Sequence, residues 1–254
     1  ADADLAASVT LYIGSFVDGI ETAAANASHM GASKGDRLSL ASETNMSKSK
    51  DAADGKDGVA QAYATIAAVT FGGDAITSCY IDAVQANVNF DAAGKITTDL
   101  TAAPQTKNQL GDGYGMKKAS SIGKEWNERA AALAGYAVGK TVAELKGMAV
   151  GEDGKAADAD LAASVTLYIG SFVDGIEAAV NSASHLGASQ GDRLSLTSET
   201  SMSKSKDADG DKEGVAQAYA TAAAVTFSGD TISSCYIDAV QANVNFDTAG
   251  KITT

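Results

Sequence analysis

A helical pattern of apolar positions occurs twice in the chain. In each occurrence, apolar residues recur at spacings of three and four, which places them along one face of an α-helix. The pattern predicts amphipathic helices over residues 5–27 and 161–183, with the apolar faces Val9, Ile13, Phe16, Ile20 and Val165, Ile169, Phe172, Ile176, Ala179. His29-Met30-Gly31 and His185-Leu186-Gly187 follow, where glycine can end a helix. We expect Phe172 and Ile176 to be buried against a sheet.

Strand-like segments follow the first helix. Val, Ile, Thr and Tyr are frequent in four stretches that turn residues such as Asp54-Gly55 and Gly72-Gly73-Asp74 separate. These stretches are 38–46, 58–71, 75–90 and 95–98. They predict a four-stranded, mainly antiparallel sheet.

Two shorter helices are predicted in the segment 99–156. Trp126, Ala130, Leu133 and Ala137 form one apolar stripe, which Gly139 ends. Residues 141–144 read Thr-Val-Ala-Glu, a capping-box pattern that predicts the start of a second helix. Strands followed by helices indicate an α+β fold, with a mainly antiparallel sheet packed against helices.

The chain contains an internal repeat. Residues 1–98 match 157–254 at an offset of 156, with 17 differences in 98 positions, whereas segment 99–156 occurs once. The order divides the chain into an N-terminal helix of an incomplete module (1–36), a complete module (37–186) and the strands of a second, incomplete module (187–254). Because the first residue is Ala1, with no leader before it, we expect a processed product or a fragment.

The net charge limits the kinds of partner that the chain can bind, and the cysteines argue against a metal or redox motif. The net charge of −13 is spread along the chain and disfavours nucleic acids and anionic membrane surfaces. No apolar run reaches the roughly 18 residues that span a bilayer. Cys79 and Cys235 occupy equivalent positions of the two copies and belong to no metal or redox motif, so we expect two buried, inert thiols.

Two loops were candidates for binding chemistry. The loop 207–214 has acidic residues but lacks the glycine position of an EF-hand, so a solvated hairpin tip is predicted. The glycine-rich loop 111–115 precedes a helix, and its amides could hold a phosphate or simply form a connection. No Ser-His-Asp, paired-His or Cys-His arrangement has a useful spacing, which argues against an enzyme.

One family resemblance concerns these loops. The order of strands, a glycine-rich loop with Ser121-Ile122-Gly123, a helix, and then Asp160 followed six positions later by Thr166 resembles the FMN-binding domain family over about residues 58–180. The resemblance implies a flavin phosphoester on Thr166 and, at the repeated motif, on Thr10. It assigns Asp160, Asp4, Gly113 and Gly115 to the same cofactor sites. The alternative is that Thr10 and Thr166 are only first-turn helix residues.

Together these patterns predict a non-enzymatic, extracellular or cell-surface repeat protein built from FMN-binding-like modules. Helix 5–27 of one chain is expected to dock on strands 191–254 of the next, which would give a head-to-tail oligomer or filament. The first alternative is an electron-transfer flavoprotein carrying FMN on threonine. The second is a solute-binding surface protein that uses the same groove.

Overall fold

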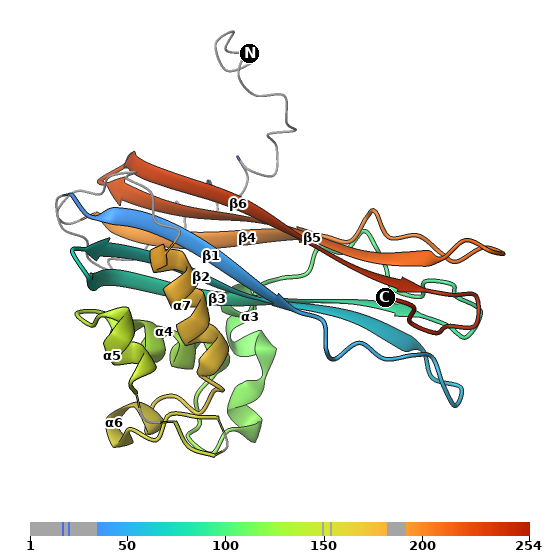
Figure 1. Ribbon diagram of the computed structural model, residues 1–254, viewed down its shortest axis with the longest axis horizontal. Helices are drawn as coiled ribbons and strands as arrows, with labels where there is room; N and C mark the ends of the chain where they lie inside the picture. The colour runs from blue at the N-terminus through green and yellow to red at the C-terminus, as the bar shows by residue number, and fades with distance from the viewer. Residues whose placement is uncertain (1–16, 18–19, 21–34, 149, 153, 182–191) are drawn as a thin grey trace, which may run out of the picture.

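The fold is α+β and contains two three-stranded antiparallel sheets (Figure 1). It comes from a computed structural model that describes residues 17, 20, 35–148, 150–152, 154–181 and 192–254. The first sheet has the order β1-β2-β3 and the second the order β4-β5-β6. The strands are β1 (Arg37–Asn45), β2 (Gly58–Gly72), β3 (Ala75–Phe90), β4 (Arg193–Ser201), β5 (Gly214–Ser228) and β6 (Thr231–Phe246).

The helices whose bounds the structure describes lie between β3 and β4 in sequence. They are α3 (Lys107–Leu110), the 3-10 helices η1 (Gly111–Tyr114) and η2 (Met116–Ala119), α4 (Trp126–Ala137), α5 (Val142–Lys146), α6 (Ala159–Ala162) and α7 (Gly170–Asn181). The predicted Trp126 helix and the Thr141 capping box are both confirmed.

Two sequence predictions need correction. The expected strand 95–98 does not form, because only Ile96 makes an isolated bridge to Phe90, so each sheet has three strands instead of four. The expected helix 161–183 is interrupted after Ala162, and its second part starts at Gly170. Between the two parts, Tyr168 bridges to Lys155 and the amide of Ile169 donates to the Gly154 carbonyl. These backbone bonds replace those of a helix.

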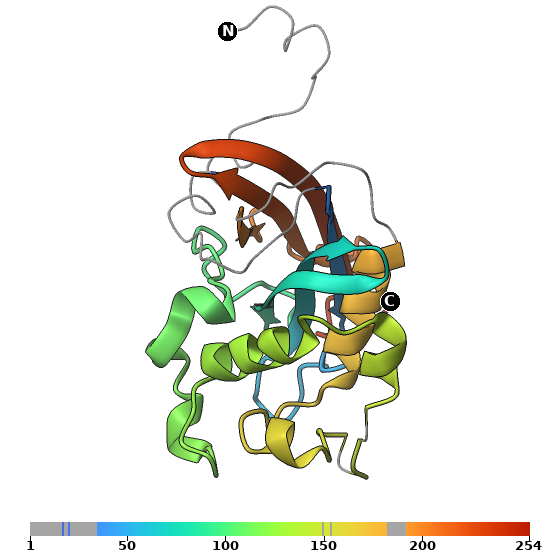
Figure 2. The same ribbon diagram turned by 90° about the vertical axis from the view of Figure 1, so that its left-hand side faces the viewer.

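The helices cover the outer face of the first sheet, as Figures 1 and 2 show. α4 packs on β3, while α7 packs on β1 and β2. Phe172 and Ile176 are buried in this layer, and the Phe172 ring lies 6.1 Å from that of Trp126. The predicted packing of this helix is therefore confirmed. Burial of such side chains stabilises the layer by about 1.5–3 kcal/mol each.

The two sheets pack face to face, with β1 facing β6 and β3 facing β4. Alanines on the facing surfaces, including Ala60, Ala86 and Ala216, permit the backbones to approach closely. The rings of Phe90 and Phe246 stack across the interface with centroids 4.1 Å apart and planes 3° from parallel. Because Phe90 and Phe246 are equivalent residues of the two copies, the repeats pair about a local two-fold axis.

The hairpin tips of the two copies are joined to each other by hydrogen bonds. The Ala52 amide donates to Gly250 O at 2.8 Å, and the Ala208 amide donates to Gly94 O at 2.9 Å. Asp207 Oδ1 accepts from the Ile96 amide at 2.8 Å, and the equivalent Asp51–Ile252 bond has the same length. The loop 207–214 was predicted to be a solvated tip: Asp207 and residues 209–213 are exposed as predicted, whereas the prediction is wrong at Ala208 and Gly214, which are buried. A repeated sequence can offer the same donors and acceptors twice, so one pattern of bonds forms in both directions.

Candidate functional site

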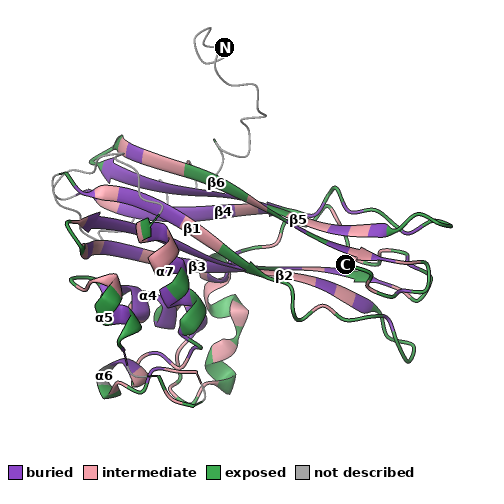
Figure 3. Ribbon diagram, viewed as in Figure 1, coloured by how far each residue is buried: buried purple, intermediate pink, exposed green. Residues whose placement is uncertain are grey.

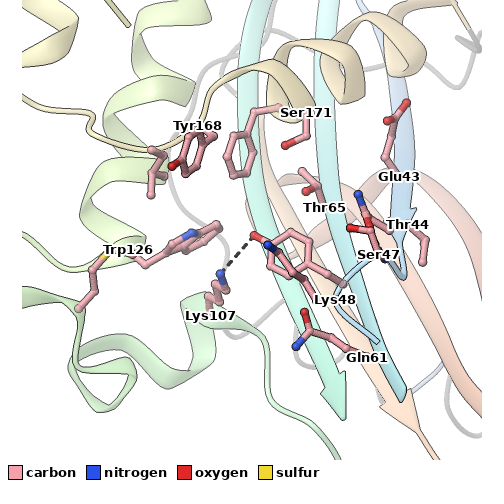
Figure 4. Close-up of a pocket in the computed structure, with 15 residues that line it drawn as sticks. Glu43, Thr44, Ser47, Lys48, Gln61, Thr65, Lys107, Trp126, Tyr168 and Ser171 are labelled. Atoms are coloured by element: carbon pink, nitrogen blue, oxygen red, sulfur yellow. Dashed lines mark hydrogen bonds between the residues drawn. The ribbon is translucent and has the colours of Figure 1, made fainter. Parts of the chain in front are cut away.

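The first candidate site is a pocket of about 510 Å³ between the first sheet and the helical layer (Figure 4). One wall is polar and comes from β1, the following turn and β2. The other is mainly aromatic or apolar and comes from Tyr63 of β2, from α3 and α4, and from α7 with the residues that lead into it. The polar wall is lined by Glu43, Thr44, Asn45, Ser47, Lys48, Gln61 and Thr65, and the aromatic side by Tyr63, Trp126, Tyr168 and Phe172. This combination is typical of a site for a small organic molecule.

Lys107 is the charged group at the centre of the aromatic side. Its side chain is buried, with 6% of the residue exposed. The ammonium donates to Tyr63 Oη at 3.2 Å and lies 4.6 Å from the centre of that ring and 5.2 Å from that of Trp126. Cation–π contacts of this kind offset part of the loss of water around the charge. A lysine held in this way presents a positive group to a ligand beside flat aromatic surfaces.

Local structure fixes the position of Lys107. It begins α3, where the Thr106 side chain accepts from the Gln109 amide and the Gln109 side chain accepts from the Thr106 amide. Thr106 also bridges to Val84 at the edge of β3. Sequence reasoning missed Lys107 because it lies in no motif. It considered Trp126 only as a member of an apolar stripe.

The sequence-predicted cofactor residues do not line this pocket where the structure describes them. Thr166 lies in the connection between α6 and α7, four residues before α7 begins, so it is not a first-turn helix residue. Gly113 lies within η1, and Gly115 follows it in a left-handed conformation with φ +78°. Asp160 lies in α6, and Asp4 and Thr10 fall outside the described residues. The neighbours Met116 and Leu167 do line the pocket.

The amides next to the glycine-rich loop already have an anionic partner. Glu125 accepts hydrogen bonds from the Met116 amide at 2.8 Å and from the Lys117 amide at 2.9 Å. Its carboxylate is buried at the start of α4. The loop therefore does not fit a flavin phosphate at these two amides, because the carboxylate holds them.

Thr166 has surroundings that fit a phosphoester better. The buried guanidinium of Arg129 donates to Thr166 Oγ1 through Nη1, and its other nitrogens donate to the Lys124 carbonyl. A guanidinium beside this hydroxyl would compensate the charge of a phosphate attached there. Residue 167 then enters the pocket lining directly.

The second candidate site is an apolar face of β6, which we call the open strip: Ile232, Cys235, Ile237 and Ala239. Their twins Ile76, Cys79, Ile81 and Ala83 are all buried beneath the helical layer. Ile232 is 45% exposed where Ile76 is 1% exposed, and Ile237 is 41% exposed where Ile81 is 2% exposed. Figure 3 shows exposed residues along the middle of β6, whereas β3 is largely buried.

One described residue of the N-terminal segment contacts the neighbouring face of β5. Ile20 packs against the cluster of Ala223, Val225 and Phe227. Its twin Ile176 contacts the equivalent cluster of the first sheet, so Ile20 and Ile176 occupy equivalent positions on the two sheets. The sequence analysis placed helix 5–27 on the strands of the next chain. Most of this helix lies outside the described residues, and at Ile20 the prediction is corrected, because Ile20 contacts the second sheet of its own chain.

Known proteins offer no guide to these two sites, so their interpretation rests on their geometry. Neither a family model, nor a curated protein, nor a solved structure matches the chain. In the described part of the chain, no helix has the length and apolar character needed to cross a bilayer.

Proposed function

We propose that this protein is a non-enzymatic, extracellular repeat protein in which paired modules form a structural unit that extends head-to-tail. The observation that carries the proposal is the open strip. The same apolar residues are buried in one copy and exposed in the other. Exposed apolar surfaces of this kind mark association sites. The family resemblance is what supports the extracellular location.

The interface between the two copies supports a structural role. Apolar clusters fill the space between the sheets along their length, from Leu38 and Leu194 to Phe90 and Phe246. The reciprocal bonds of the hairpin tips lock the relative position of the sheets. The two sheets therefore form one long body, in which the open strip has a fixed position (Figure 1).

The position of the open strip determines how one unit can join the next. The strip lies on the second sheet, whereas the helical layer lies on the first, so a contact between them joins different surfaces. Contacts between different surfaces propagate into rings or filaments. We therefore expect assembly in which the second sheet of one unit meets a helical layer of another.

Sedimentation velocity at increasing concentration, followed by electron microscopy, tests this proposal. We expect larger species to grow with concentration in the unmodified chain and to be lost in Ile237→Asp, which places a charge in the open strip. Asn243→Asp is the matched control, since it adds the same charge at an exposed position of the same strand. A chain that stays monomeric at all concentrations, or an Ile237→Asp variant that assembles normally, would contradict the proposal.

A flavoprotein is the second candidate, and the Arg129–Thr166 contact favours it. A bound flavin would supply electron transfer, while Arg129 would hold the phosphate and the aromatic side of the pocket would orient a planar ring. Absorption near about 450 nm together with the intact mass tests this. We expect Thr166→Ala to remove both signals if flavin is attached there. A colourless protein of unmodified mass rejects this candidate and leaves the structural proposal untouched.

A further inference from the structure

One wall of the pocket beside the helical layer is duplicated in the second copy, and the other wall is not. Most residues of the sheet wall recur unchanged, as Tyr63 does at Tyr219. The corresponding part of the second sheet lines a smaller hollow of about 320 Å³, with residues 100–103 on its other side. That stretch has no charged side chain and no aromatic ring. Lys107 and Trp126 belong to the segment that occurs once, so the charge and the rings opposite the sheet are particular to the first pocket.

The ammonium group of Lys107 has hydrogen-bonding capacity that the described residues use in part. An ammonium carries three N–H donors, and the acceptor that Lys107 has is Tyr63 Oη at 3.2 Å. Among the described residues, no carboxylate forms an ion pair with Lys107. Burial raises the pKa of Asp82 and the nearby charge of Lys107 partly opposes this, but Asp82 Oδ1 accepts from the Ala83 and Asn108 amides. A bonded anion would therefore stabilise the buried cation further.

The charges that line the pocket favour a ligand with a single negative charge. The lining includes two lysines, Lys48 and Lys107, and one acid, Glu43, in a chain whose net charge is −13. Lys48 and Glu43 are exposed, so water weakens their effect, whereas Lys107 is buried. No arginine is among the described residues of the lining, although arginine forks and groups of backbone amides are the usual partners of phosphate. One carboxylate matches the charge of one buried ammonium.

The aromatic side of the pocket favours a flat ring as the body of the ligand. The Trp126 and Phe172 rings are buried, with centroids 6.1 Å apart and planes at 52°. Tyr168 is 70% exposed and also lines the pocket, so a bound ring can cover it. Figure 4 shows Lys107 and Trp126 next to each other on the helical side, with Thr65 on the sheet side. A ring can contact these aromatic faces while its charged group reaches Lys107.

We propose that this pocket reversibly binds a small aromatic carboxylate. The carboxylate pairs with Lys107 Nζ, and the ring lies against Trp126 and Phe172. The volume of about 510 Å³ lies in the range of sites for small organic molecules. This binding goes beyond the proposed structural function, which does not use the pocket. The duplicated sheet thus supplies the scaffold, and the segment that occurs once supplies the groups that recognise the ligand.

Three probes of nearly the same size test the preference for charge. Phenylacetate is negative, phenylacetamide is neutral and phenethylamine is positive. Calorimetry on dilute protein measures their affinities, and tryptophan fluorescence reports the place of binding, because Trp126 is the single tryptophan of the chain and lines the pocket. We expect phenylacetate to bind about tenfold or more tightly than phenylacetamide, since it adds a hydrogen bond between charged groups. Phenethylamine should bind most weakly.

A matched pair of lysine variants assigns the preference to one residue. Lys107→Met keeps the length of the side chain and removes its charge, so we expect phenylacetate to lose about tenfold in affinity and phenylacetamide to change little. Lys118→Met is the control, because it removes the same charge from an exposed residue of η2 that does not line the pocket. It should bind all three probes as the unmodified chain does. The probe series in the unmodified chain decides the question even where Lys107→Met fails to fold.

Equal affinity of the unmodified chain for phenylacetate and phenylacetamide overturns the inference, as does the failure of all three probes to bind at millimolar concentration. Phenylacetate binding that Lys107→Met leaves unchanged, or that does not alter the fluorescence of Trp126, places the ligand elsewhere and also overturns it. An intact mass that includes a flavin on Thr166 overturns it as well, because the pocket then belongs to the flavin. None of these results bears on the open strip of the other sheet, which sedimentation tests separately.

Discussion

Asp82 is a buried carboxyl group at the edge of β3, and its twin Asp238 is exposed on β6. Burial raises the pKa of Asp82 from 3.8 to about 6, although hydrogen bonds from Thr106, Asn108 and Ala83 partly oppose the increase. The pKa of Asp82 rises because burial removes the charged carboxylate from water. The same residue type therefore has a different energetic role in each copy, and the helical layer makes the difference.

This pKa predicts a pH dependence of stability. A carboxyl whose folded pKa lies above its unfolded value binds more protons in the folded state, so its contribution to the free energy of unfolding falls as pH rises from about 4 to about 6. Two units correspond to at most about 3 kcal/mol. We expect Asp82→Asn to be more favourable relative to the unmodified chain at pH 7 than at pH 4, measured by urea unfolding. Asp238→Asn, which makes the same change at the exposed twin, is the matched control.

The isoleucine twins offer a second matched comparison. Ile81 lies in the core beneath α4, whereas Ile237 lies in the open strip. We expect Ile81→Ala to lower the free energy of unfolding by about 2–5 kcal/mol, because it leaves a cavity in a packed layer. Ile237→Ala should cost less than about 1 kcal/mol, since the side chain is already partly in water. Equal losses in the two variants, measured by urea unfolding of dilute protein, would show that the open strip is covered.

At the scale of elements, two turns of the second copy depend on glycines for different reasons: Gly250 lies in a hairpin tip that contacts the other copy, and Gly229 lies in the turn between β5 and β6. Gly250 has φ +65°, and a Cβ there would lie 2.7 Å from Ala52 Cβ and 2.7 Å from Asp91 O of the other copy. Gly229 has φ +59°, but a Cβ there would meet nothing within 4 Å. Gly250 is thus required both by its left-handed backbone conformation and by the lack of space for a side chain. Gly229 is required by its conformation alone.

Alanine substitutions separate these two effects. We expect Gly229→Ala to cost about 1–2 kcal/mol from the left-handed conformation alone. Gly250→Ala should cost clearly more, because the added methyl group also pushes the two tips apart. Thermal unfolding compares the two variants, and amide exchange at Ala52 and Ile252 reports the tips directly. A Gly250→Ala protein no less stable than Gly229→Ala would argue against tight contact between the tips.

At the scale of the whole molecule, the two copies share one interface and should unfold together. Phe90 and Phe246 stack at its two-fold axis and are both fully buried. We expect Phe246→Ala to cost about 3–5 kcal/mol. The loss should appear in both copies, which amide exchange over β2 and β5 can follow separately. Destabilisation confined to β5 would indicate that the copies fold independently.

Much of the local structure could be predicted from the sequence, because it depends on short-range patterns. The stripe at Trp126 became α4, the pattern at Thr141 became a capped helix, and three strands lie close to their expected limits. The errors fell where tertiary backbone bonds compete with local preference. Tyr168 and Ile169 pair with segment 154–155 instead of continuing a helix, and the Ile96 amide donates to Asp207 of the other copy instead of extending a strand.

The sequence by itself determined that there are two nearly identical copies and that one segment occurs once, and it predicted three strands of the first copy and the helices at Trp126 and Thr141. It could not decide how identical copies face each other, because equal sequences carry no information on their relative placement. Only the tertiary structure paired the sheets through Phe90 and Phe246 and placed Lys107 among three aromatic rings. It also buried Ile81 while exposing Ile237. The physical reason is that burial depends on what packs against a residue, and the helical layer packs against β3 and not against the open strip of β6.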